Sequence, residues 1–324
     1  MSCLLNPLAP VEHFHLVHPR PHEPGTSSLR PWQPMLWIVL AILTAFFNAS
    51  AATLAKQGLS ELRPWEMGMV PTAFAGLICL LILPFIEIPS LDATFWWAWG
   101  LSLPLMVVAL YFQYSAIQLS PLSLTMPYLS FTPAFVIITG YLLLDEVLNI
   151  WGLLGVLFIA AGGYVLNVEV GSGRGLADPI RAVFREPGSW RMLVTAIIFS
   201  LTGVFGRMGV LHSSAMFFGL TMLPALGALF VASGIILRQA RLCSLWEKPR
   251  AAALAGTCVA LEIICHHLSI ALAKSAYMLA VKRLNTLISV IYGGLVFQEK
   301  NLAVRLSGTL LMLLGVAMIG LLGK

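Results

Sequence analysis

The sequence predicts an all-α integral membrane protein in which ten transmembrane helices form two inverted five-helix repeats. Hydrophobic residues make up 59% of the 324 residues and charged residues only 10%, a composition far from that of soluble domains. Apolar runs of about 20 residues, long enough to cross a bilayer, recur along the chain. The segment 121–166 also recurs in register at 274–322. No strand-like alternation competes with the helical pattern.

The expected helices follow one another with short connections. Their approximate ranges are 35–55, 68–86, 95–118, 121–144 and 150–168 in the first half, and 191–210, 215–237, 251–272, 275–297 and 302–322 in the second. All nine tryptophans fall near the ends of these spans, as in the aromatic belts at membrane interfaces. Prolines at 104, 127, 133 and 224 lie within spans and are expected to kink or loosen them.

The internal repeat aligns particular landmarks. Glu146 corresponds to Glu299, Gly140 to Gly293, Gly155 to Gly308, and Gly162 to Gly315. Because each copy has an odd number of helices, the second copy enters the membrane in the opposite orientation, as in many secondary transporters. The glycines form small-residue faces that allow close helix packing. The two glutamates stand at helix ends and are expected to cap the N-terminus of the helix that follows.

Four segments follow from this pattern: a tail at 1–34, the first repeat at 35–168, a linker at 169–190 and the second repeat at 191–324. The tail is rich in proline and lacks apolar periodicity, so we expect it to be disordered; Met35 is an alternative start. Its four histidines are too weakly supported to predict a metal site. The distribution of Lys and Arg over the loops favours an orientation in which both termini lie on the outer, non-cytoplasmic side of the membrane.

Charge and motifs exclude two classes of function. The net charge of +5 comes from dispersed residues, without the one-faced cluster that nucleic-acid binding requires. No nucleophile with a base and no metal-binding motif lies at membrane depth. We therefore expect neither an enzyme nor a cofactor. The expected partners are a small-molecule substrate and the lipid bilayer, with a homodimer left open.

Ionisable groups inside predicted spans cost several kcal/mol each unless they are paired or hydrated. Lys282 and Arg283 are such groups, and helical spacing places Lys282, Asn285 and Ser289 on one polar stripe. The stripe is expected to bind an anion or carboxylate in a cavity between the halves. The alternatives are an ion pair with Glu262 that serves only structure, or snorkelling to the nearer surface.

Glu262 and His266 also lie within a span and, four residues apart, share one helix face. A carboxylate at this depth could carry a coupling proton, and His266 could extend the relay. The alternative is that Glu262 only neutralises Lys282 or Arg283, with His266 bonded to a backbone carbonyl.

Other spans supply further candidates for the substrate pathway. They are Asn48 and Lys56 in the first helix, Tyr111 and Gln113 in the third, and Arg207 in the sixth. Lys56 and Arg207 occupy matching positions of the two repeats. Aromatic and amide groups at mid-membrane suit an amphipathic solute, although ordinary interhelical hydrogen bonding explains each of them equally well.

Over residues 35–323 the chain resembles the EamA-type members of the drug/metabolite transporter superfamily. The corners Leu-Leu-Leu-Asp145-Glu146 and Leu-Val-Phe-Gln298-Glu299 and the run Ala276-Tyr-Met-Leu-Ala-Val-Lys282-Arg283 carry the resemblance. Asp145 and Gln298 stand where the family often has glycine. The resemblance implies two five-helix repeats in the bacterial inner membrane. It also implies cytoplasmic termini, in conflict with the charge distribution.

These observations together predict a secondary transporter. We expect it to export a small amphipathic or anionic metabolite by alternating access, with a proton as the coupling ion. The alternative is a flippase for a polyprenyl phosphate, whose head group the basic pair could contact. Flippases of this superfamily, however, resemble short four-helix chains that dimerise, whereas this chain already contains both halves.

Overall fold

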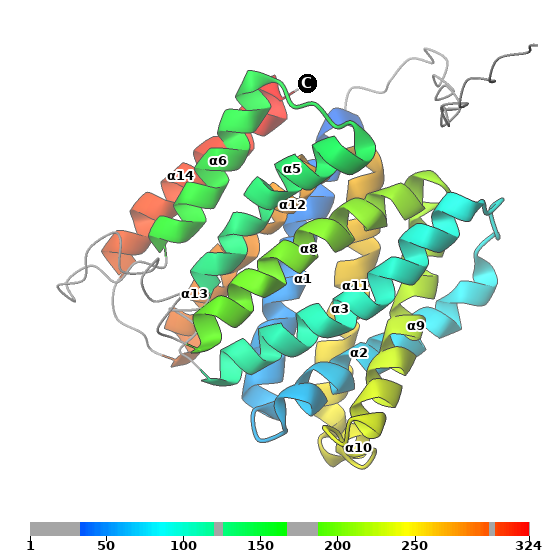
Figure 1. Cartoon of the computed structure of the whole chain (residues 1–324). Helices are drawn as coiled ribbons and strands as arrows, with labels where there is room; N and C mark the ends of the chain where they lie inside the picture. Colours follow the sequence, from blue (N-terminus) through cyan, green and yellow to red (C-terminus); the bar gives the residue numbers. More distant parts are fainter. Residues whose placement is uncertain (1–32, 120–125, 167–186, 298–301, 324) are drawn as a thin grey trace, which may run out of the picture. The chain divides into compact units, whose positions relative to one another are not determined.

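A computed structural model describes residues 33–119, 126–166, 187–297 and 302–323 (Figure 1). The predictions for the tail, most of the linker and Glu299 fall outside these residues. The described part of the chain is helical and contains no strand, which confirms the all-α class. Residues Pro34–Lys324 form one compact unit.

Six helices are long and apolar enough to cross a membrane, so the protein is a multi-pass membrane protein. They are α1 (Gln33–Leu59), α2 (Pro64–Ile82), α3 (Ala93–Leu119), α8 (Pro187–Leu211), α9 (Ala215–Ile236) and α11 (Pro249–Leu272). Each covers one of the predicted spans to within a few residues. Both α3 and α9 continue through their internal prolines, Pro104 and Pro224, as α-helices.

The other elements are shorter. They are η1 (Leu83–Phe85), η2 (Met126–Phe131), α5 (Thr132–Leu144), α6 (Ile150–Leu166), α10 (Ser244–Glu247), α12 (Ser275–Lys282), α13 (Leu284–Phe297) and α14 (Leu302–Leu322). The predicted continuous helix at 275–297 is therefore wrong, because the chain is interrupted at Arg283. There the Arg283 N–H donates to Ala280 O at 2.9 Å and Thr286 N–H to Arg283 O at 3.0 Å. Both bonds span three residues instead of the four of an α-helix.

The predicted span at 121–144 is also not a single α-helix where it is described. It begins as the 3₁₀ helix η2 and becomes α-helical at Thr132, with Pro133 in the first turn of α5. Proline suits this position because the first turn of a helix does not use its N–H groups.

Glycines bring α6 and α14 together, and the two helices lie side by side in Figure 1. A Cβ atom added to Gly155 would lie 2.8 Å from Gly315 O, and one added to Gly162 would lie 2.6 Å from Gly308 O. The backbones thus approach more closely than any side chain would allow, which confirms the predicted small-residue packing.

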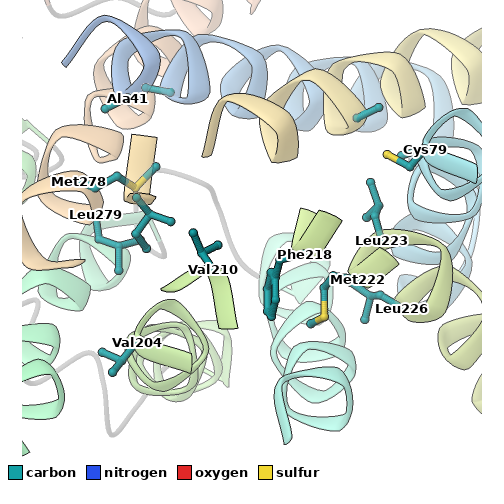
Figure 2. Packing of buried hydrophobic residues seen from close by; sticks show 14 of the residues in the cluster. Ala41, Cys79, Val204, Val210, Phe218, Met222, Leu223, Leu226, Met278 and Leu279 are labelled. Carbon is teal, nitrogen blue, oxygen red and sulfur yellow. The ribbon is translucent and has the colours of Figure 1, made fainter. Parts of the chain in front are cut away.

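Other contacts also join the first half of the sequence to the second: α3 packs on α8, α2 on α9 and α11, and α5 on α8 and α12. Figure 2 shows part of the core, with Phe218, Met222 and Leu226 of α9 and Leu279 of α12. Many large apolar residues are instead exposed, including Leu81 at 74% and Leu142 at 69%, as expected for surfaces that face lipid.

Trp65 is the second residue of α2, close to a helix end as predicted. Trp65 is buried, and its indole N–H donates to Phe230 O at 3.0 Å. It ties α2 to α9 because a buried indole needs an acceptor.

Candidate functional site

A cavity of about 160 Å³ lies among helices from both halves of the sequence. Its walls come from α1, α2, α3, η2, α8, α9, α11, α12 and the start of α13. Cavities of about 150 Å³ lined by apolar side chains are large enough to bind benzene. This cavity also contains charged groups, so it is a candidate binding site for a small molecule that is not purely apolar.

Glu262, His266 and Lys282 come together in this cavity. Lys282 Nζ lies 2.8 Å from Glu262 Oε1 and 3.5 Å from His266 Nδ1. Residues 262 and 266 face the same way because they are one helical turn apart on α11, and Lys282 is the last residue of α12. The side chains of Lys282 and Glu262 are 15% and 9% exposed, so this is a largely buried ion pair.

Arg283 also lines the cavity, and its environment differs from that of Lys282. The residue is 3% exposed. Its Nε is buried without a hydrogen-bond partner, and the side chain forms no ion pair with any residue that the structure describes. A buried guanidinium in this situation is unusual, because five N–H donors and a full charge normally find acceptors.

Polar residues from the first half complete the site. Asn285 Nδ2 donates to Asn48 Oδ1 at 2.6 Å, which links α13 to α1 across the cavity wall. Gln113 and Tyr114 line the cavity from α3. The Tyr114 ring has room because its neighbour is Gly68, where an added Cβ would lie 2.6 Å from the ring.

The structure separates the predicted site residues into two groups. Seven line the cavity: Asn48, Gln113, Glu262, His266, Lys282, Arg283 and Asn285. Ser289, Tyr111, Lys56 and Arg207 are not among the lining residues; Tyr111 instead packs against Trp65, with ring centroids 5.1 Å apart. Sequence reasoning missed His267, which lines the cavity while its Nδ1 lies 2.9 Å from Ile263 O. Its position beside His266 was the only signal.

Glu146 does not cap the helix that follows it, so that prediction is wrong. Its carboxylate accepts the backbone N–H of Ser275, with 2.9 Å from the nitrogen to Oε2, and thereby caps α12 in the other half of the sequence. The N-terminus of α6 is capped by Asn149, whose Oδ1 accepts the Gly152 N–H at 2.7 Å. Sequence order alone could not reveal this exchange of partners.

The local backbone explains where Glu146 points. Asp145 adopts a left-handed conformation with φ of 52°, which glycine and, less readily, Asp can adopt. The turn closes with a bond from the Glu146 N–H to Gly140 O at 3.2 Å. The carboxylate then lies over Gly140, where an added Cβ would be 3.3 Å from Glu146 Oε2.

Arg207 completes this second cluster, which also lies between the two halves. Its Nε lies 2.5 Å from Glu146 Oε1, and its Nη1 donates to Ile270 O at 2.6 Å and to Ala273 O. Burial raises the pKa of the Glu146 carboxyl, although Arg207 and the Ser275 N–H act in the opposite direction. Arg207 therefore binds protein groups at the end of α11 and is not exposed to the cavity.

Comparisons with known proteins agree with the fold. No curated protein matches the chain. Among solved structures 29 chains match. One, titled "Crystal structure of protein", has a TM-score of 0.67 and 18% sequence identity, and the match covers 89% of this chain and 96% of that one. At this identity the likeness concerns the fold alone.

The model of the EamA-like transporter family matches residues 35–168. This segment contains Asn48 and Gln113 of the cavity and the corner that carries Glu146. Over residues 35–168, less than half of its length, the chain is therefore similar to the EamA-like transporter family.

Proposed function

We propose that this protein is a secondary transporter that binds a small amphipathic or anionic metabolite in the cavity beside Glu262, Lys282 and Arg283. The observation that carries the proposal is a cavity with two cations and one carboxylate in its walls, formed by helices of both halves. Charged side chains at membrane depth are expensive and usually face a substrate or ion pathway.

The architecture that we propose for this transporter is two inverted five-helix repeats, at 35–168 and 191–324, joined by a linker at 169–190. Two features support it. Matching helices of the two halves pack against each other, as α6 does on α14 and α2 on α9, and the helix that carries Lys282 is broken beside the cavity, as transporter helices often are at binding sites. Alternating access would then move one half relative to the other around the cavity.

We place the protein in the bacterial inner membrane and propose outward transport. The membrane potential, negative inside, favours the exit of an anion by about 2.3 kcal/mol per elementary charge and 100 mV.

Glu262 is the residue that we propose for proton coupling. A proton on Glu262 would release Lys282 from its ion pair, so protonation of Glu262 would change the affinity of the cavity for an anion. The titratable groups around Glu262 are His266, Cys258 and Cys265 on α11, Lys282 and Arg283 at the end of α12, and Tyr114 on α3. His266 could pass the proton on, because it shares a face of α11 with Glu262 and its Nδ1 lies 3.5 Å from Lys282 Nζ.

A flippase for a polyprenyl phosphate is the alternative function. The cationic residues could contact its phosphate, but a cavity of about 160 Å³ suits a small solute better than a long lipid. Lipid extraction from gently purified protein would reveal a stoichiometric polyprenyl phosphate if the flippase is correct.

Transport by purified protein in proteoliposomes tests the proposal. The full chain should exchange a labelled anionic metabolite from a panel, and the Glu262→Gln variant should lose any response to an imposed pH gradient. Lys248→Gln is the matched control, because Lys248 is partly exposed and bonds to Glu61, away from the cavity. Flux that is the same in wild type and Glu262→Gln under every pH gradient would remove the coupling. Absence of flux for the whole panel would count against a transporter of anions.

A further inference from the structure

We propose that Arg283 alone is the anion-binding group of the cavity, and that the substrate is a monoanion: a carboxylate attached to a compact apolar body about the size of one benzene ring. This inference rests on the proposed function above. It assigns different roles to two neighbouring cations: Arg283 binds the substrate, and Lys282 forms an ion pair within the protein.

The environment of Arg283 is that of a group whose partner is a ligand. The residue is 3% exposed, yet its buried Nε has no hydrogen-bond acceptor among the described residues. A lone buried charge costs several kcal/mol, and bound anions or counter-charges offset that cost. A guanidinium presents a planar fork of N–H donors that matches the two oxygens of a carboxylate.

Lys282 is already committed to the protein. Its ammonium lies 2.8 Å from a Glu262 carboxylate oxygen and 3.5 Å from His266 Nδ1. Those contacts use two of the three N–H donors of the ammonium, and the Glu262 carboxylate offsets its charge. Lys282 therefore needs no external anion while Glu262 is ionised.

The charge balance of the walls sets the charge of the ligand. Among the lining residues that the structure describes, the charged ones are Glu262, Lys282 and Arg283, and the other titratable bases are His266 and His267. With the imidazoles neutral, the cavity has one excess positive charge, which a monoanion neutralises. A phosphate dianion would leave one negative charge buried. The ammonium of a zwitterion would find no free carboxylate, because Glu262 is engaged by Lys282.

The remaining walls accommodate an apolar body. The lining also includes Met67, Met106, Leu110, Tyr114, Phe199, Phe218 and Met222. Methionine and aromatic side chains suit a flat ring, and methionine adapts to small differences in shape. The volume of about 160 Å³ limits that body to about one ring.

Binding to the purified full-length protein in nanodiscs tests this inference. The probes share one ring and differ in charge: benzoate (monoanion), phenyl phosphate (dianion), phenylalanine (zwitterion) and benzyl alcohol (neutral). Calorimetry and thermal shift should rank benzoate first. Arg283→Gln should weaken benzoate binding roughly tenfold or more, and Arg283→Lys should restore part of it. The double variant Lys282→Gln/Glu262→Gln keeps the net charge and should weaken benzoate binding less than Arg283→Gln does.

Folding of the variants is controlled by their unliganded melting temperatures. Arg283→Gln removes a lone buried charge, so its unliganded form should melt no lower than wild type. Lys248→Gln, at a residue that precedes α11, does not line the cavity and bonds to Glu61, should match wild type in every assay. Benzoate binding that survives Arg283→Gln, or a preference for phenyl phosphate or benzyl alcohol, would overturn the inference.

The same proteoliposomes separate this inference from the proposed function. If phenyl phosphate or phenylalanine is transported and benzoate is neither bound nor transported, the result supports the transporter function and contradicts the monoanion site. If benzoate binds through Arg283 but no member of the panel crosses the membrane, the result supports the monoanion site and contradicts the transporter function.

Discussion

Glu146 and Arg207 form an ion pair between the two halves of the sequence, with 2.5 Å between Glu146 Oε1 and Arg207 Nε. Glu146 also accepts the first backbone N–H of α12, from Ser275, while Arg207 donates to Ile270 O at the end of α11. One ion pair thus binds both sides of the connection between α11 and α12. These two helices carry Glu262 and Lys282, so the ion pair of Glu146 and Arg207 helps to hold in place two helices that line the cavity.

Replacing Glu146 by Ala should destabilise the protein by about 2–4 kcal/mol, because it removes the carboxylate beside the largely buried Arg207 and the acceptor of the Ser275 N–H. Thermal or denaturant unfolding in one detergent measures this. Glu61→Ala is the matched control: Glu61 also forms an ion pair, with Lys248, but its side chain is 78% exposed, and no measurable change is expected. Equal stability of the two variants would show that the Glu146–Arg207 contact does not hold the halves together.

The same residue predicts a pH dependence. Burial raises the pKa of Glu146 above its ordinary value of 4.5, so the folded state binds this proton more tightly than the unfolded state. The contribution of this proton to stability is complete below the unfolded pKa and is lost as pH rises through the higher folded pKa. Between about pH 4 and pH 7, wild type should therefore lose more stability than Glu146→Gln.

The difference between the melting temperatures of wild type and Glu146→Gln, followed against pH, separates the contribution of Glu146 to stability from the contributions of the other carboxylates. Asp92 is one of those: burial acts to raise its pKa, but hydrogen bonds from the Phe95 N–H and His212 and the charge of His212 together outweigh burial and lower the pKa. Its stabilisation is lost as pH falls, which is the opposite sign. A difference curve that is flat over this range would contradict the raised pKa of Glu146.

A double-mutant cycle tests whether Lys282 and Glu262 act as a unit. Each single change, Lys282→Gln or Glu262→Gln, leaves one charge without its partner at 2.8 Å and should cost about 2–4 kcal/mol. The double variant should cost less than the sum of the two, with a coupling energy of about 1–3 kcal/mol. Unfolding in the absence of ligand measures all four proteins. Additive losses would mean that the two charges are stabilised by other groups.

Sequence reasoning found the charged residues of the cavity because the cost of a charge in lipid is a local property. Glu262, His266, Lys282 and Arg283 stand out in apolar runs, and all four line the cavity. The same argument placed Arg207 on the substrate pathway, although it bonds to Glu146 and to backbone carbonyls. Burial of a cation is readable from the sequence, whereas the identity of its neighbour depends on how distant segments pack.

The helix interruption shows a second limit. Pro133 is a sequence signal for the start of α5. No glycine or proline lies next to Arg283 to indicate the helix break there. Hydrophobic periodicity continues across residues 275–297, so the sequence favours one helix. The break also changes the expected polar stripe: Lys282 and Asn285 line the cavity, but Ser289, farther along α13, does not.

Close packing of α6 and α14 provides the last prediction. In Gly315→Ala the new Cβ would lie 2.5 Å from Gly155 O. This neighbour is backbone and cannot rotate away, so the two helices must separate. We expect a loss of about 1–3 kcal/mol in the free energy of unfolding. Gly100→Ala is the control, because nothing lies within 4 Å of its added Cβ. In the interior of α3, alanine should leave stability unchanged or raise it by up to about 1 kcal/mol. If both variants unfold like wild type, the contact between α6 and α14 is looser than the glycine geometry requires.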